Sequence, residues 1–331
     1  MFSNDLETRP NMSKKRGSAD CEWLEDCESA KHGAIRGIVR KWCAFRPNMS
    51  KKRGSADCEW FYHMKNFRIS NYQIRSPKLR GLAPAVFLHI SDVHLHSFDA
   101  RAHFYLSCMR KENPDAILVT GDMNIGREHR TLLSSARFLI EAQKIAPVYY
   151  ELGNHEYKLR IRRETSPLYE RYEDKLRRNG ITVLHNESAV FEKAGNTFRI
   201  HGLELPMVYY RKGLPPRHTG NLLNRLLGRC PQEEFQILLA HNPRYGQDYL
   251  AWGADLTLAG HYHGGVMHLG ENRGLISPQF IPFPGFACGM FEQDGRHMIV
   301  SSGMGEHTVT VRINNPRELV VIRISGDPDK D

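Results

Sequence analysis

Five short apolar runs of this 331-residue chain each lead into side chains that can bind a metal ion. The runs cover residues 86–90, 116–120, 148–152, 237–240 and 256–259. They are followed in turn by Asp92 and His94, by Asp122, by Asn154 and His155, by His241, and by His261 and His263. Runs of this kind are typical of parallel strands that are buried on both faces. The chain is therefore predicted to be an α/β protein whose strands bring these side chains together at one edge of a sheet.

The spacing of these residues predicts how they share metal ions. In an extended strand the side chains of positions i and i+2 lie on the same side, so Asp92 and His94 are expected to bind one ion together. His261 and His263 repeat this spacing. No cysteine stands at these positions, and oxygen and nitrogen ligands suit Mn, Fe or Zn in a hydrolytic site better than a structural zinc. Two divalent metal ions are thus the predicted cofactors.

The same residues resemble the five motifs of the calcineurin-like metallophosphoesterases, in the order found in that family. The motifs are Ser91-Asp92-Val93-His94, Gly121-Asp122-Met123, Gly153-Asn154-His155-Glu156, His241 and Gly260-His261-Tyr262-His263. The resemblance covers about residues 71 to 325. Within the family, residues 72–79 and 302–305 look most like the bacterial phosphodiesterases that include the enzymes cleaving UDP-2,3-diacylglucosamine.

This resemblance implies a fold, a reaction and a role for each motif residue. The implied fold is the four-layer α/β/β/α metallophosphoesterase sandwich. Seven residues would hold the metals: Asp92, His94 and His263 the first, Asn154, His241 and His261 the second, and Asp122 both. His155 would donate a proton to the leaving oxygen. Two adjacent cations can activate hydroxide and neutralise phosphoryl charge, so the expected reaction is hydrolysis of a phosphodiester or pyrophosphate bond.

Substrate selection is expected in residues 202–229. This segment combines many leucines and two tyrosines with five cations against one acid, Glu204. Arg211, Lys212 and Arg217 are the predicted substrate-binding residues. Apolar surface with interspersed cations suits a small-molecule or lipid phosphoester, such as a lipid or nucleotide conjugate. The alternative is a surface helical hairpin whose leucines pack inward and whose basic face is only solvated.

The remaining periodicity predicts helices that alternate with strands. Apolar residues at helical spacing indicate helices over residues 100–110, 131–143 and 168–178. Shorter strands are expected at residues 182–184, 189–192, 197–200, 298–301 and 319–324. Two other functions fit the same fold, a nuclease and a noncatalytic metal-binding scaffold. A scaffold needs neither His155 nor the complete ligand set, and this chain has both.

The first 65 residues are expected to differ from the rest of the chain. The segment RPNMSKKRGSADCEW occurs twice, at residues 9–23 and 46–60. Residues 1–80 carry 17 Lys and Arg against 9 Asp and Glu. Because residues 1–65 are polar and lack long apolar runs, we expect a basic, disordered extension ahead of a catalytic domain at 66–331. Residues 35–42 have the pattern of a helix on an anionic membrane surface, and a partly helical arm is the alternative.

Charge and cysteine usage narrow the partners and the compartment. Residues 81–331 carry 29 Lys and Arg against 28 Asp and Glu, which disfavours a nucleic-acid partner. The seven cysteines form no CxxC pair, and no run reaches the ~18–20 apolar residues that span a bilayer. We expect a cytoplasmic protein, with peripheral contact at the inner face of the membrane as an open alternative. The sequence carries no signal for an oligomeric state.

Overall fold

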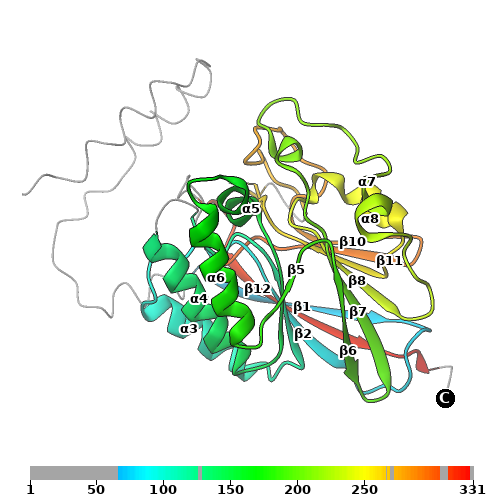
Figure 1. Ribbon diagram of the computed structural model, residues 1–331. Helices are drawn as coiled ribbons and strands as arrows, with labels where there is room; N and C mark the ends of the chain where they lie inside the picture. Colours follow the sequence, from blue (N-terminus) through cyan, green and yellow to red (C-terminus); the bar gives the residue numbers. More distant parts are fainter. Residues whose placement is uncertain (1–65, 126–128, 266, 269–271, 306–311, 329–331) are drawn as a thin grey trace, which may run out of the picture. The chain divides into compact units, whose positions relative to one another are not determined.

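The computed structural model describes residues 66–125, 129–265, 267–268, 272–305 and 312–328. The predicted extension at residues 1–65 lies outside this part of the chain, together with its duplicated segment and the pattern at residues 35–42. The described residues form two six-stranded sheets with helices on their outer faces (Figure 1). The α/β/β/α sandwich implied by the motifs is therefore confirmed.

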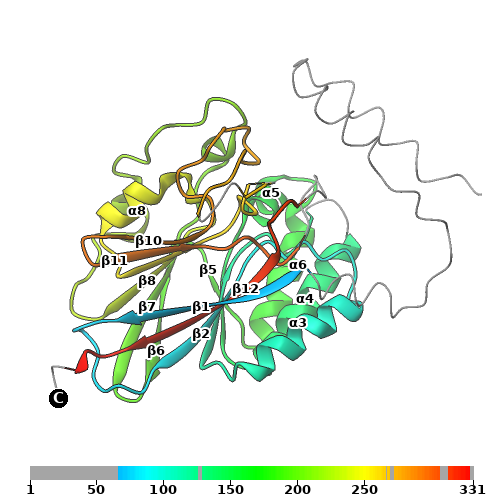
Figure 2. The same cartoon turned by 180° about the vertical axis from the view of Figure 1, so that it is seen from behind.

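The first sheet has the strand order β1-β12-β2-β3-β4-β5. Its strands are β1 (Phe67–Arg75), β12 (Arg317–Ser325), β2 (Ala85–Ile90), β3 (Ala116–Thr120), β4 (Val148–Glu151) and β5 (Thr182–Leu184). Neighbouring strands are parallel except for β12 and β2. The first and last strands of the described chain thus lie side by side, as Figure 2 shows for β1 and β12.

The second sheet has the strand order β10-β11-β9-β8-β7-β6. Its strands are β10 (Gly289–Gln293), β11 (Arg296–Val300), β9 (Leu256–Ala259), β8 (Phe235–Leu239), β7 (Asn196–Gly202) and β6 (Ser188–Lys193). The four central strands are parallel, and hairpins add an antiparallel strand at each edge.

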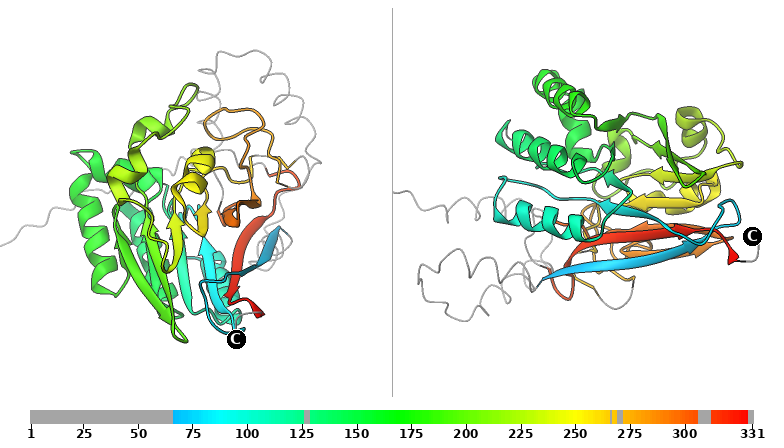
Figure 3. Two further views of the ribbon diagram at one scale, coloured as in Figure 1. Left: turned by 90° about the vertical axis from the view of Figure 1, so that its right-hand side faces the viewer. Right: turned by 90° about the horizontal axis from the view of Figure 1, so that it is seen from below.

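Helices cover the outer face of each sheet (Figures 1 and 3). On the first sheet these are α3 (Ala100–Lys111), α4 (His129–Gln143), α5 (Asn154–Ile161) and α6 (Ser166–Arg178). On the second they are α7 (Leu222–Leu227) and α8 (Gly246–Trp252), with the 3-10 turns η1 (Met207–Tyr210) and η2 (Pro243–Tyr245). The chain positions of α3, α4 and α6 agree with the predicted helices.

Alternation along each strand builds three apolar layers. In β2, Leu88 and Ile90 pack under the helices of the first sheet, whereas Phe87 packs between the sheets. In β8, Ile237 and Leu239 face the space between the sheets, and Leu238 packs under α8. Side chains that point both ways explain why these strands are apolar at successive positions.

The five apolar runs all form strands, but they do so in two sheets. Runs 86–90, 116–120 and 148–152 form β2, β3 and β4 of the first sheet, and the other two form β8 and β9 of the second. The prediction of a single sheet edge was therefore wrong. Burial on both faces marks a central strand without saying which sheet contains it. None of the helices in the described part of the chain is long and apolar enough to cross a membrane.

Candidate metal centre

Side chains from both sheets gather into three overlapping clusters of potential metal ligands. The clusters are Asp92 with His94 and His263, His94 with Asp122 and His155, and Asp122 with His241 and His261. Within each cluster the ligand atoms all lie within 4.8 Å of one another. His94 and Asp122 each belong to two clusters, so the three groups form one continuous site.

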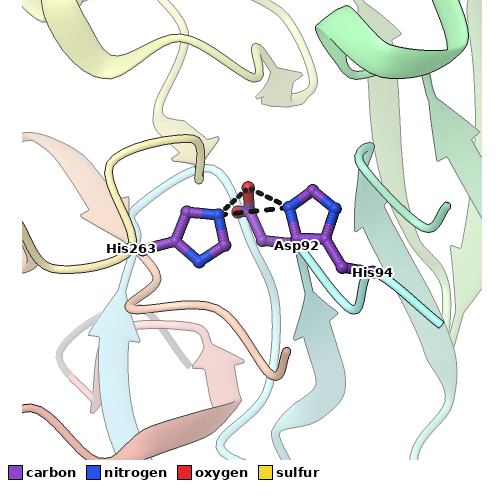
Figure 4. Close-up of side chains that lie close together, drawn as sticks. All are labelled: Asp92, His94 and His263. Carbon is purple, nitrogen blue, oxygen red and sulfur yellow. Dashed lines mark hydrogen bonds and ion pairs between the residues drawn. The ribbon is translucent and has the colours of Figure 1, made fainter. Parts of the chain in front are cut away.

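The first cluster joins the end of β2 to the segment after β9 (Figure 4). His263 Nε2 lies 3.2 Å from Asp92 Oδ1 and 3.2 Å from His94 Nε2. The two imidazole rings stack with their centroids 5.1 Å apart. All three side chains are buried, with Asp92 completely inaccessible. One carboxylate oxygen and two imidazole nitrogens therefore converge on one position.

The second and third clusters centre on the Asp122 carboxylate. Its Oδ2 atom lies 3.2 Å from His241 Nε2, 3.9 Å from His155 Nε2 and 4.0 Å from His94 Nε2. His241 donates its Nδ1 proton to the Thr120 carbonyl at 2.6 Å, which directs Nε2 toward Asp122. Such an outer hydrogen bond is how proteins orient a metal-binding imidazole.

The backbone at this site is left-handed rather than extended. Five of the predicted ligands have positive φ angles: Asp92 at 51°, His94 at 44°, Asp122 at 51°, His261 at 63° and His263 at 47°. Strand β2 already ends at Ile90. The expectation that strand alternation places Asp92 beside His94 was therefore wrong, although the two side chains do meet. Residues other than glycine adopt this conformation at an energetic cost, and such strain collects at functional sites.

Glycines allow the strand ends to approach closely. A Cβ atom on Gly121, whose φ is +74°, would collide with the backbone of Gly153. This contact brings the end of β3 against the end of β4 and sets Asp122 beside the start of α5. A Cβ atom on Gly260 would likewise collide with the side chains of Ser91 and Asp92. Because Gly260 has no side chain, the histidines of the second sheet can lie close to Asp92 in the first.

The residues present fit bound divalent cations. Asn154 Oδ1 is a buried acceptor atom that makes no hydrogen bond within the described residues. An unpaired polar atom in such a position costs free energy unless it has a ligand. Carboxylate, imidazole and amide donors without thiolate suit Mn, Fe or Zn. The donor set and this unpaired amide oxygen suit bound divalent cations.

The electrostatics of the site favour positive charge at His241. Burial opposes ionisation of Asp122, yet the imidazoles of His241 and His155 hold the pKa of that carboxyl well below its usual range. Burial also opposes protonation of His241, whereas the Asp122 carboxylate raises the pKa of this imidazole to about 10. A metal ion that binds Nε2 must therefore displace a proton, which couples metal binding to proton release.

Glu156 holds the loop that carries Asp122, a role that the sequence did not reveal. Its carboxylate is fully buried and accepts from the backbone N–H groups of Asp122 at 2.9 Å, Met123 at 2.8 Å and Asn124 at 3.2 Å. The Asn124 side chain donates to it at 2.9 Å. Burial and the Asp122 carboxylate raise its pKa to about 7. The only signal was its position directly after His155, where a first-turn helix acid is equally expected.

Two further residues contact the predicted ligands. Tyr210, in η1, places its ring edge-on to His261 at 5.3 Å and tilted to His241 at 6.1 Å. Arg312 Nη2 lies 3.3 Å from His263 Nδ1. Tyr210 was foreseen only as an apolar member of the segment 202–229, and no sequence signal marked Arg312. The predicted substrate-binding residues Arg211, Lys212 and Arg217 are exposed and lie outside the three clusters.

Comparisons with known proteins agree with this geometry. The family model described as calcineurin-like phosphoesterase matches residues 85–265. An uncharacterized metallophosphoesterase of Aquifex aeolicus is 25% identical over 80% of this chain and 95% of that protein. The uncharacterized metallophosphoesterase YkoQ of Bacillus subtilis is 25% identical over 72% of this chain and 82% of its own length. Phosphodiesterase YaeI of Escherichia coli is 24% identical over 73% and 83%.

Proposed function

Because the chain belongs to the calcineurin-like phosphoesterase family and is a hydrolase, we propose that it cleaves a phosphodiester or pyrophosphate bond at a dinuclear metal centre. The observation that carries this proposal is the position of Asp122. Its carboxylate lies between the His94 side of the site and the His241 side, at 4.0 Å and 3.2 Å from their Nε2 atoms. A carboxylate in this position is suited to bridge two ions.

The proposed ligand sets are built on the first and third clusters, and Asn154 is added to the second set from the motif resemblance. Asp92, His94 and His263 would hold one ion, Asn154, His241 and His261 the other, and Asp122 both. Two divalent ions bound there supply charge that activates water and stabilises a phosphoryl group under attack. The family and the clustered ligands support metal dependence, and Mn, Fe and Zn all suit the donor set.

His155 is the proposed proton donor. Its side chain is 26% exposed, whereas that of Asp122 beside it is 2% exposed. The His155 backbone N–H donates to Asp122 Oδ1 at 2.9 Å, which fixes the residue at the start of α5. The His155 imidazole therefore lies next to the predicted metal ligands and remains accessible to a substrate. An imidazole in this position can give its proton to the leaving oxygen.

The proposed substrate is a small-molecule or lipid phosphodiester or pyrophosphate. The relative named phosphodiesterase supports the diester class. Tyr210 packs against His241 and His261. Because Arg211 and Lys212 directly follow Tyr210, the backbone that carries these two cations begins beside the metal centre. Arg217 lies further along the same segment. Cations so placed suit a substrate with a second phosphate, and cleavage of a UDP-diacylglucosamine-like conjugate is the narrower form of this proposal.

A reconstitution experiment tests the proposal. The purified chain is stripped with a chelator, reloaded with Mn, Fe or Zn, and assayed on bis-nitrophenyl phosphate, nitrophenyl phosphate, a UDP-sugar and single-stranded DNA. We expect metal-dependent hydrolysis of a diester or pyrophosphate that His241→Ala abolishes. His201→Ala is the matched control, because His201 is equally buried at the end of a neighbouring strand but bonds to Gln236 at 2.8 Å. Hydrolysis without metal, or full activity of His241→Ala, would refute the proposal, and cleavage of DNA alone would favour a nuclease.

A further inference from the structure

Three large apolar side chains of the described residues are mostly exposed to solvent. Leu214 is 95% exposed, Phe283 69% and Phe280 59%. They are the most exposed large hydrophobic residues in the described part of the chain. Two of them are aromatic, and burial of such a ring is worth ~1.5–3 kcal/mol. An exposed apolar cluster of this kind marks a surface that contacts another partner.

The three side chains belong to one surface, which we call the rim and define as residues 211–217 and 277–283. The Gly213 backbone donates to the Gln279 carbonyl at 3.2 Å, and the Gln279 side chain donates back to the Arg211 carbonyl at 3.2 Å. Lys212 Nζ lies 4.9 Å from the centroid of the Phe280 ring. The two segments lie together at the top of the molecule in Figures 1 and 2.

The backbone of the rim holds its aromatic rings outward. Phe280 and Phe283 have φ angles of 60° and 47°, a conformation that bulky residues rarely adopt. The Phe280 N–H donates to the Ser277 carbonyl at 2.9 Å, and the Phe283 N–H to the Leu275 carbonyl at 2.9 Å. Gln279 between them is 1% exposed and anchors the turn. The exposed rings therefore belong to a loop that backbone hydrogen bonds hold in place, and both phenylalanines adopt strained backbone angles.

The rim itself carries charge of one sign. Residues 211–217 and 277–283 contain three cations, Arg211, Lys212 and Arg217, and no Asp or Glu. Asp248 contacts the two residues that follow Arg217: it accepts from the Thr219 backbone at 2.6 Å and lies 3.5 Å from His218. All three cations are exposed, and within the described residues none of them forms an ion pair. The rim thus combines exposed apolar side chains with cations that are available to an anionic partner.

The rim is also fixed to the metal centre. The Tyr209 carbonyl accepts from Asn242, Tyr245 and Gln279, each at 3.1 Å. Asn242 directly follows His241, and Tyr210 packs on His241 and His261. Hydrogen bonds therefore lead from the rim to the residue next to a predicted ligand. Whatever binds the rim is held close to the metal centre.

We propose that the rim docks on the surface of an anionic lipid bilayer. Leu214, Phe280 and Phe283 enter the interface, where aromatic rings and leucine gain from burial, and the cations contact lipid phosphates. Folded proteins that bind membranes in this way need both contributions for stable attachment. The proposal uses no residue of the segment 1–65, and binding of the rim to a membrane requires no turnover.

Vesicle flotation with the full chain tests this proposal. The rim variant carries Leu214→Asn, Phe280→Asn and Phe283→Asn, because asparagine tolerates positive φ and leaves the fold intact. The matched control carries Leu82→Asn, Leu133→Gln and Val190→Thr, three exposed apolar residues outside the rim. We expect the native chain and the control to float with vesicles rich in phosphatidylglycerol, and the rim variant to bind at least about tenfold more weakly. Binding should weaken in high salt and on phosphatidylcholine.

Thermal unfolding and metal content, unchanged in both variants, show that each remains folded. Because all three proteins keep residues 1–65, any contribution of that segment cancels in the comparison. The proposal is overturned if the native chain does not bind vesicles, if the rim variant binds as tightly as the native chain, or if the control loses as much. Rim-dependent binding of single-stranded DNA without vesicle binding would assign the surface to nucleic acid instead.

Discussion

A half-buried imidazole outside the metal centre, that of His185, predicts a loss of stability at alkaline pH. His185 Nδ1 lies 2.8 Å from Glu204 Oε1, and its Nε2 lies 2.9 Å from Glu173 Oε2. The His185 side chain is 13% exposed. Because both nitrogens face carboxylates, both must carry a proton. Burial lowers the pKa of His185, but the hydrogen bonds that the imidazole donates to the two carboxylates raise it to about 9.

The size of the effect follows from the two pKa values. Folding raises the pKa of His185 from 6.5 to about 9, which corresponds to at most about 3 kcal/mol of stabilisation, because solvent screens part of the interaction of a half-buried group. This contribution is fully present below pH 6.5, because the imidazole is then protonated in both states. It decreases above pH 6.5 and is lost as the pH passes through 9, where the folded state also gives up its proton.

Urea unfolding at pH 6 and pH 10, with a chelator present, measures this change. Between the two pH values, native protein should lose more of its unfolding free energy than His185→Gln, which cannot carry the charge, by up to about 3 kcal/mol. His218→Gln is the control, because that side chain is 75% exposed and its contact with Asp248 at 3.5 Å contributes little. The same pH dependence in native protein and His185→Gln would refute this explanation.

Four substitutions test the metal centre. Asp122→Ala should abolish turnover and retain at most one metal per chain by elemental analysis, whereas Asn154→Ala should leave one site largely filled; two metals in Asp122→Ala would contradict the bridging role. His155→Ala should keep both metals but slow turnover ~10²–10⁴-fold, with a smaller loss on nitrophenyl esters that need no proton. An equal loss on good and poor leaving groups would argue against proton donation. Glu156→Gln should weaken metal binding and lower the unfolding free energy by about 1–3 kcal/mol, because its amide NH₂ meets the Asp122 N–H instead of accepting from it. Calorimetry that finds neither change would remove Glu156 from its positioning role.

The sequence predicts much of the fold, because apolar runs and ligand-bearing strand ends are local patterns. It identified strands β2 to β9, β11 and β12 and helices α3, α4 and α6. It did not predict β1, whose partner β12 lies at the other end of the chain, because a half-buried strand has a weak pattern of its own. The division into two sheets was also missed, since burial on both faces is common to central strands of either sheet.

At the site, the sequence predicted which side chains lie close together, but it did not predict the backbone conformation that positions them. Asp92 and His94 meet through left-handed backbone that no residue pattern reports. Glu156 was ambiguous, because a carboxylate in the first helical turn is expected with or without a buried role. Arg312 reaches His263 from a segment without any motif. Such contacts depend on packing between distant segments, which local periodicity does not encode.

The place of β12 between β1 and β2 also determines when the first sheet can close. Arg68 on β1 pairs with Glu318 on β12, a partner 250 positions further along the chain. During synthesis, β1 has no strand to join until the last strand leaves the ribosome, and β2 keeps an open edge for the same time. Long-range pairing of this kind folds slowly, and open edges invite pairing with other chains. We therefore expect nascent fragments that end before β12 to aggregate more readily than the full chain.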